Sequence, residues 1–103
     1  MSRPKVRVAG WSTVDPKKRD DVVESFKDLV LRARSAPGCL DNAITADPVD
    51  PKRINVFELW RSEEDLSSWR AASHPPSQVT RMRRMEVQKH VIQRSGPPFG
   101  RRR

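Results

Sequence analysis

The sequence predicts an α+β domain in which a four-stranded antiparallel sheet carries helices on one face. Three observations support this prediction. A hairpin occupies residues 38–60, a helical pattern stands on each side of it, and one further strand pattern lies toward each end of the chain. The second strand of the hairpin has apolar residues on both faces, so the other face of the sheet also requires a cover.

The 103 residues are enough for one domain with a small core, to which an oligomer would add buried surface. Residues 1–94 are expected to fold, and residues 95–103 (SGPPFGRRR) to form a flexible basic tail. The sequence has no apolar stretch of membrane-spanning length and no signal-peptide pattern. A single cysteine, Cys39, cannot form an intramolecular disulfide. These features favour a cytoplasmic protein with no membrane partner.

The net charge of +8 raises the question of nucleic acid as a partner. Arg101, Arg102 and Arg103 supply three of these charges, and a local cluster near residues 81–84 supplies others. The strands lack the interleaved aromatic residues of RNA-binding sheets, and no recognition-helix pattern is present. We therefore interpret the charge as a solvated basic face with a basic tail, and expect no specific nucleic-acid partner.

Residues 6–14 (VRVAGWSTV) form the first expected strand, with Val6 and Val8 on one face and Arg7 and Trp11 on the other. Asp15 and Pro16 then suit the N-cap and first position of a helix over residues 17–34. Its apolar residues recur at spacings of three and four and predict one buried stripe. The stripe consists of Val22, Phe26, Leu29, Val30 and Ala33.

Residues 39–46 and 54–60 form the two strands of the expected hairpin. The turn between them, DPVDPKR over residues 47–53, cannot continue a strand ladder, because each proline lacks an amide hydrogen. In the second strand, one face holds Ile54, Val56, Glu58 and Trp60, and the other holds Asn55, Phe57 and Leu59. This alternation is typical of a strand.

Ser62 and the three acidic residues after it predict the start of a second helix, with Leu66 and Trp69 on its inward face. Residues 77–85 suggest a further helical turn with Val79 and Met82 inward, and residues 87–94 a last strand. The element order is then β-α-β-β-α-β. One sheet face would be bare in this arrangement, so a second copy of the chain is expected to cover it.

The stretch from Pro37 to His74 resembles the antibiotic biosynthesis monooxygenase family, and a weaker likeness extends over residues 5–94. The resemblance lies in Pro37-Gly38-Cys39-Leu40, in Glu58-x-Trp60, in Ser62, Glu64 and Leu66, and in Ser73-His74-Pro75. It implies a ferredoxin-like fold and a homodimer that packs sheet-to-sheet into an α+β barrel. It also implies a small-molecule ligand, since members of the family include oxygenases that form quinones in polyketide pathways without a cofactor, and enzymes that degrade haem.

The resemblance to the haem-degrading members is incomplete. Trp69 matches a tryptophan of theirs, but their first-strand asparagine falls at Gly10 or Trp11 here and their axial histidine at Val79. Without that ligand we expect no haem. One cysteine and two histidines do not reach the spacing of a zinc site either. The expected enzyme therefore uses neither metal nor cofactor.

The leading hypothesis is a cofactor-independent monooxygenase acting on an electron-rich aromatic or polyketide-type molecule. His74 or His90 would take a proton from the substrate, because histidine is well suited to proton transfer near neutral pH. Asn42 would hydrogen-bond the resulting anion and Trp69 would stack on its ring. Trp11 and Phe57 complete the expected substrate-binding residues.

Each of these residues also has a structural interpretation. Trp69 suits a helix-face core position, and His74 suits a surface loop. For His90 the alternatives are an inward position and the dimer seam. For Glu58 the structural alternative to a ligand is an ion pair with Arg7 or Lys89. If no titratable group faces a pocket, the alternative function is a non-catalytic ligand-binding or stress-response module of the same fold.

Overall fold

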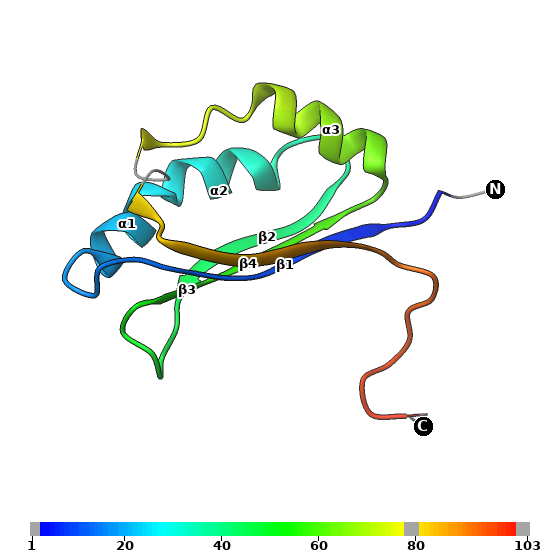
Figure 1. The fold of residues 1–103 in the computed structure, drawn as a ribbon. Helices are drawn as coiled ribbons and strands as arrows, with labels where there is room; N and C mark the ends of the chain where they lie inside the picture. The colour runs from blue at the N-terminus through cyan, green and yellow to red at the C-terminus, as the bar shows by residue number, and fades with distance from the viewer. Residues whose placement is uncertain (1–2, 78–80, 101–103) are drawn as a thin grey trace.

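The computed structural model describes residues 3–77 and 81–100, and places all three of their helices on one face of a four-stranded antiparallel sheet (Figure 1). The strand order is β2-β3-β1-β4. The strands are β1 (Val6–Thr13), β2 (Cys39–Ala46), β3 (Arg53–Trp60) and β4 (Arg84–Val91), and the helices are α1 (Arg19–Ser25), α2 (Lys27–Arg34) and α3 (Glu63–Ala72). This arrangement confirms the predicted ferredoxin-like fold.

The core lies between the helices and the sheet and has two parts. One part surrounds the paired rings of Trp60 on β3 and Trp69 on α3; it comprises Val6, Val8, Ala33, Trp60, Leu66 and Trp69. The other comprises Val14, Val22, Phe26 and Ile54. The inward residues of the predicted strands and helices supply both parts, because each element contributes one apolar face to the same layer.

The β2–β3 hairpin has the strands and the turn that the sequence predicts. Within the turn, the Asp47 carboxylate accepts hydrogen bonds from the backbone amides of Val49 (3.0 Å) and Asp50 (2.8 Å) and from Asn55 Nδ2 (2.9 Å). One terminal nitrogen of Arg19 donates to three backbone carbonyl oxygens of the turn, at 2.9–3.2 Å. Helix α1 therefore fixes the hairpin turn from outside.

The Asp47 carboxylate makes the stability of this turn dependent on pH. Its hydrogen bonds with Asn55 and with backbone amides lower its pKa from 3.8 to about 2. Because the folded pKa is the lower one, the stabilisation is complete above the ordinary value and is lost as the pH falls toward 2. Asp47→Ala should therefore melt below the wild type at neutral pH, and this difference should shrink in acid. Thermal melts across that pH range check it; a constant difference would contradict it.

Residues 17–34 do not form the single helix that the sequence predicts, because α1 and α2 meet at a break at Phe26. The Ser25 hydroxyl donates a hydrogen bond to the Val22 carbonyl oxygen, which the Phe26 amide would use in a continuous helix. The Phe26 amide donates instead to the Val23 carbonyl oxygen, at 3.0 Å. Competition of this kind from a serine hydroxyl bends helices. Val22 before the break and Phe26 at the break are both buried.

The beginning of this helical region also differs from the prediction. The Asp15 carboxylate accepts a hydrogen bond from the Lys17 amide at 2.9 Å, and the Asp15 carbonyl oxygen accepts one from the Lys18 amide at 2.9 Å. Asp15 therefore caps a turn, and α1 begins after it, at Arg19.

Strand β4 begins and ends three residues earlier than predicted, at Arg84–Val91. Pairing with β1 sets both limits, because Thr13 pairs with Arg84 and Val6 pairs with Val91. Residues 84 and 85, expected in a helical turn, therefore belong to the strand. Of that predicted turn, residues 78–80, with Val79 among them, lie outside the described residues.

The face of the sheet away from the helices is bare in the described part of the chain (Figure 1). Alternation along the strands places there the residues Ala9, Trp11, Ala43, Phe57 and Leu59, all half-buried. Strand β3 thus has apolar residues on both faces, as the sequence predicts.

Gly10 lies at the centre of β1, opposite Val56 on β3 and Val87 on β4. Its φ of +153° is one that residues with a side chain rarely adopt. A Cβ at this position would overlap the Glu86 carbonyl oxygen and approach within 2.7 Å of Val87 Cα. The pairing of β1 with β4 at this point therefore depends on glycine.

In the described ranges, no helix has the length and apolar character needed to cross a membrane. After β4, residues 95–100 turn away from the sheet (Figure 1).

Candidate functional site

A buried carboxylate, that of Glu58, lies between the helices and the sheet. It accepts hydrogen bonds from Trp60 Nε1 at 2.9 Å and from a terminal nitrogen of Arg70 at 3.1 Å. The sequence-based suggestion that Glu58 pairs with Arg7 or Lys89 is wrong. Alternation places Arg7 on the bare face, and Lys89 pairs with the first residue of α3 at 3.4 Å. The partner of Glu58 comes from α3, which sequence spacing alone does not place above β3.

Asn42 lies directly opposite Glu58 in the pairing of β2 with β3 and is 1 % exposed. Its backbone carbonyl oxygen accepts a hydrogen bond from Arg34 Nε at 2.8 Å. Its side-chain oxygen is buried and has no hydrogen-bond partner among the described residues. Asn42 thus places an unused acceptor on the helix side of the sheet, where a polar group without a partner is costly.

Trp69 is part of the core and is 8 % exposed. Its ring stacks on that of Trp60, with centroids 6.2 Å apart and an interplanar angle of 27°. The guanidinium of Arg32 lies 5.7 Å from the centroid of the Trp69 ring. The Trp60 ring and the Arg32 guanidinium thus already contact the Trp69 ring, on which a flat ligand would have to stack.

His74 is exposed and follows the end of α3. Its φ of +47° belongs to the left-handed region, which is uncommon for a residue other than glycine. Arg32 donates hydrogen bonds to the carbonyl oxygens of Ser73 (2.7 Å) and His74 (3.4 Å), and so holds this segment against α2. His74 therefore lies in the helix layer, at its surface.

Trp11, Phe57 and His90 lie on the bare face of the sheet, on β1, β3 and β4 respectively. Two guanidinium groups flank the Trp11 ring: that of Arg53 lies 5.1 Å from the ring centroid and that of Arg84 lies 5.3 Å from it. The neighbouring strands on both sides of Trp11 supply these cations.

His90 pairs with Arg7 across β1 and β4, and the two residues line an open groove of about 740 Å³ together with residues 91–95. We call this the His90 groove. The imidazole is half-buried, and its Nδ1 is buried with no hydrogen-bond partner in the described part of the chain. Of the two histidines, His90 is among the residues that line this groove and His74 is not.

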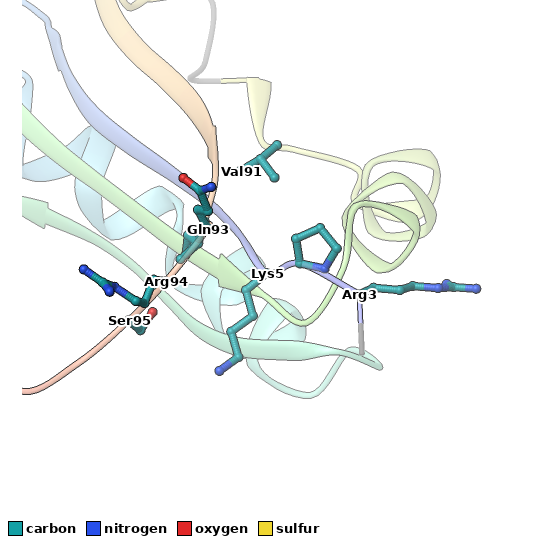
Figure 2. Close-up of a pocket in the computed structure, with 8 residues that line it drawn as sticks. Arg3, Lys5, Val91, Gln93, Arg94 and Ser95 are labelled. Atoms are coloured by element: carbon teal, nitrogen blue, oxygen red, sulfur yellow. The ribbon is translucent and has the colours of Figure 1, made fainter. Parts of the chain in front are cut away.

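A second groove, of about 810 Å³, adjoins the first where β1 begins and β4 ends (Figure 2). Residues 3–5 and 91–95 line it, and we call it the strand-end groove. Residues 91–95 line both grooves, so the two adjoin along this segment.

The sheet separates the predicted site residues. Asn42 and Trp69 lie on its helix side, Trp11, Phe57 and His90 lie on its bare face, and His74 lies at the surface of the helix layer. One pocket holding all of them is therefore not formed. Arg7, Lys5 and Arg94 also line the grooves, although no sequence motif identifies them. Alternation could have placed Arg7 beside His90, but only with the β1–β4 register in hand.

Among the described residues, no three or more histidine, cysteine, aspartate or glutamate side chains are grouped so as to hold a metal ion. Cys39 is half-buried against the core, and burial raises the pKa of its thiol above the ordinary value of 9.0.

Comparison with known proteins connects this fold to one family. The sequence profile described as antibiotic biosynthesis monooxygenase matches residues 6–75, which include β1, the hairpin and α3. A stretch of 59 residues is 29 % identical to an uncharacterised protein of Synechocystis sp.. That match covers 57 % of this chain and 40 % of the relative's length.

Solved structures share the fold at low sequence identity. A conserved protein of unknown function from Bacteroides thetaiotaomicron has a TM-score of 0.76 at 17 % identity, over 88 % of this chain and 100 % of its own. Proteins proposed to be antibiotic biosynthesis monooxygenases are similar as well. The one from Nitrosomonas europaea has a TM-score of 0.75 at 14 % identity over 90 % of this chain and 93 % of its own. The one from Deinococcus radiodurans also has a TM-score of 0.75, at 13 % identity over 92 % of this chain and 99 % of its own.

Proposed function

The chain belongs to the antibiotic biosynthesis monooxygenase family, and on that premise we propose that it oxidises an electron-rich aromatic or polyketide-type small molecule with O2. The reaction would need no metal, haem or flavin, as the family resemblance implies. The observation that carries the proposal is the position of His90, a titratable side chain beside a cation, Arg7, in a groove of about 740 Å³. Ligand pockets are commonly of this size and combine apolar surface with a few polar groups.

The proposed reaction begins when His90 takes a proton from a phenol or enol, while Arg7 stabilises the anion that forms. The anion gives one electron to O2, and the resulting radical and superoxide combine to form a carbon–oxygen bond. The protonated His90 returns its proton to the peroxide. Loss of water then leaves one oxygen atom as a new carbonyl, and the other departs as water with the proton that His90 returned and the hydrogen that remained on the oxidised carbon. O2 is thus the sole oxidant.

We propose that the active form is a homodimer in which the bare sheet faces of two copies pack together. The half-buried apolar residues of that face support this, since a domain of this size gains stability by covering them. His90 lies on the same face, so a partner would also exclude water from its groove. Exclusion of water strengthens the electrostatic stabilisation of an anion.

Sedimentation at micromolar concentration is expected to give twice the 11.8 kDa mass of one chain. Phe57→Lys places a charge at the centre of the proposed interface, between Ala9 and Ala43, and should yield monomers. Lys27→Gln, an exposed change in α2, serves as control and should leave the dimer intact. A folded wild-type monomer under these conditions would rule out the sheet-to-sheet dimer.

Oxygen uptake tests the activity, with a panel of naphthols and of phenols whose ring system carries an activated methylene group. His90→Gln is expected to lower the rate by about 10²- to 10⁴-fold, the usual contribution of a general base. His74→Gln should have little effect, because His74 lies at the surface of the helix layer. The reverse pattern would make His74 the base. Uptake equal to that of protein-free solution would reject the reaction.

A ligand-binding module without turnover is the second candidate. The observation that favours it is the burial of Trp69 between Trp60 and Arg32, which leaves the ligand contacts to open grooves. In that case ligand binding would persist with no oxygen uptake by the wild type.

A further inference from the structure

The strand-end groove has a distinct chemical character: it is basic and contains no acid. Within the described residues, the segment before β1 and the segment after β4 run side by side, joined by a hydrogen bond from the Ile92 amide to the Lys5 carbonyl oxygen at 2.8 Å. The basic residues of this groove and the His90 groove are Arg3, Lys5, Arg7 and Arg94, and no aspartate or glutamate lines either one.

Three of these four cations, Lys5, Arg7 and Arg94, make no ion pair within the described ranges. Arg3 pairs with Glu64 at 3.3 Å, outside the groove. Elsewhere the protein neutralises many of its arginines, among them Arg70, which pairs with Glu58 at 3.1 Å. Cations gathered without a counter-charge produce a positive potential that attracts anions.

The arrangement of the side chains suits a ligand with one charged end. In Figure 2, Lys5, Arg94 and Ser95 lie to the same side of Arg3, whose side chain extends in the opposite direction. Val91 contributes apolar surface to the same groove. An arginine and a lysine bind carboxylate or phosphate oxygens through charge-assisted hydrogen bonds, and a serine hydroxyl can add a neutral one.

We propose that the strand-end groove binds the carboxylate or phosphate group of a small organic anion, through Lys5 and Arg94, and that Arg7 extends this positive surface toward His90. The inference rests on the proposed function in one respect: it names the substrate class as an aromatic acid, with its oxidised ring at His90 and its anionic group at the strand-end groove. Anion binding itself requires no turnover.

Titration calorimetry with the full chain tests the proposal using three probes of similar ring size: 2-naphthoate, 2-naphthyl phosphate and the neutral methyl 2-naphthoate. At least one of the anions should bind about tenfold or more tightly than the ester, and the advantage should fall with salt. Comparing the two anions distinguishes a carboxylate site from a phosphate site.

The double variant Lys5→Gln and Arg94→Gln should remove this advantage. A matched control, Lys27→Gln with Lys52→Gln, removes the same two charges from exposed positions outside both grooves and should keep it. Because all four residues are exposed, both variants should melt near the wild type.

Equal affinity for the ester and both anions would overturn the proposal, as would an equal loss of affinity in the two double variants. Saturable binding of a single-stranded oligonucleotide that displaces naphthoate at far lower concentration would instead assign the surface to a nucleic acid. Anion binding without oxygen uptake would uphold the groove and reject the oxygenase. If the wild type takes up oxygen but shows no preference for anions, and the Lys5 and Arg94 double variant takes up oxygen at the same rate, the oxygenase would be upheld and the anion-binding groove rejected.

Discussion

Trp69→Ala is expected to cost about 3–5 kcal/mol of folding stability, the range for removal of a large buried aromatic side chain. The substitution leaves a cavity beside Trp60, whose ring stacks on Trp69 in the larger part of the core. It also removes the aromatic partner of the Arg32 guanidinium. A small domain is stable by about 5–15 kcal/mol in total, so the variant should be largely unfolded well below the melting temperature of the wild type.

Trp69→Phe is the matched control, because it keeps an apolar ring in the core and removes the indole N–H. We expect this variant to stay folded, with a moderate fall in melting temperature. Thermal melts combined with binding of flat aromatic ligands separate the two roles of Trp69. A cost of only about 1–2 kcal/mol for Trp69→Ala, with loss of ligand binding in Trp69→Phe, would show that the ring lines a ligand site.

Gly10→Ala is expected to separate β4 from β1 or to unfold the chain. A side chain at a φ of +153° costs about 1–3 kcal/mol in backbone strain. The added Cβ also overlaps the Glu86 carbonyl oxygen, a main-chain atom that cannot rotate aside as a side chain would. Relief therefore requires movement of the central part of β4, whose register with β1 holds His90 beside Arg7.

Gly96→Ala provides the control for Gly10→Ala, because the added Cβ at that position meets no atom within 4 Å apart from those of Gly96 and its two chain neighbours. Hydrogen exchange of the β4 amides and the melting temperature report the outcome. Gly10→Ala should accelerate exchange in β4 and lower the melting temperature, and Gly96→Ala should change neither. If the two variants behaved alike, the close approach of β1 to β4 would not limit stability.

The hairpin could be predicted from the sequence because its determinants are local. Alternation along Ile54–Trp60 and two Asp-Pro pairs in the turn are sufficient to place both strands within a residue. The N-cap of α3 at Ser62 is also determined locally, and the Ser62 hydroxyl oxygen accepts a hydrogen bond from the Asp65 amide as expected. The element order then restricts the fold to few alternatives.

What could not be predicted depends on contacts between distant segments. The break at Phe26 arises from a hydroxyl that competes with the backbone, a choice that a periodic apolar pattern does not reveal. The ends of β4 depend on its register with β1, and the partner of Glu58 comes from a helix. For the same reason the site residues could be named but not grouped, since His90 and Trp69 lie on opposite sides of the sheet.

The position of β1 between β3 and β4 has a consequence for the order of events during synthesis. β1 leaves the ribosome before every other element described here, yet both of its partner strands follow much later. Val6, its first residue, pairs with Trp60 on β3 and with Val91 on β4. The hairpin can form as soon as it emerges. β1, by contrast, remains unpaired until its partner strands emerge, and Val6 and Val8, which are buried in the folded protein, stay exposed until then. In a cell that slows translation between the hairpin and β4, the nascent chain would present an unsatisfied strand edge to chaperones and to other nascent copies. Codon choice over residues 61–83 would then influence the yield of folded protein.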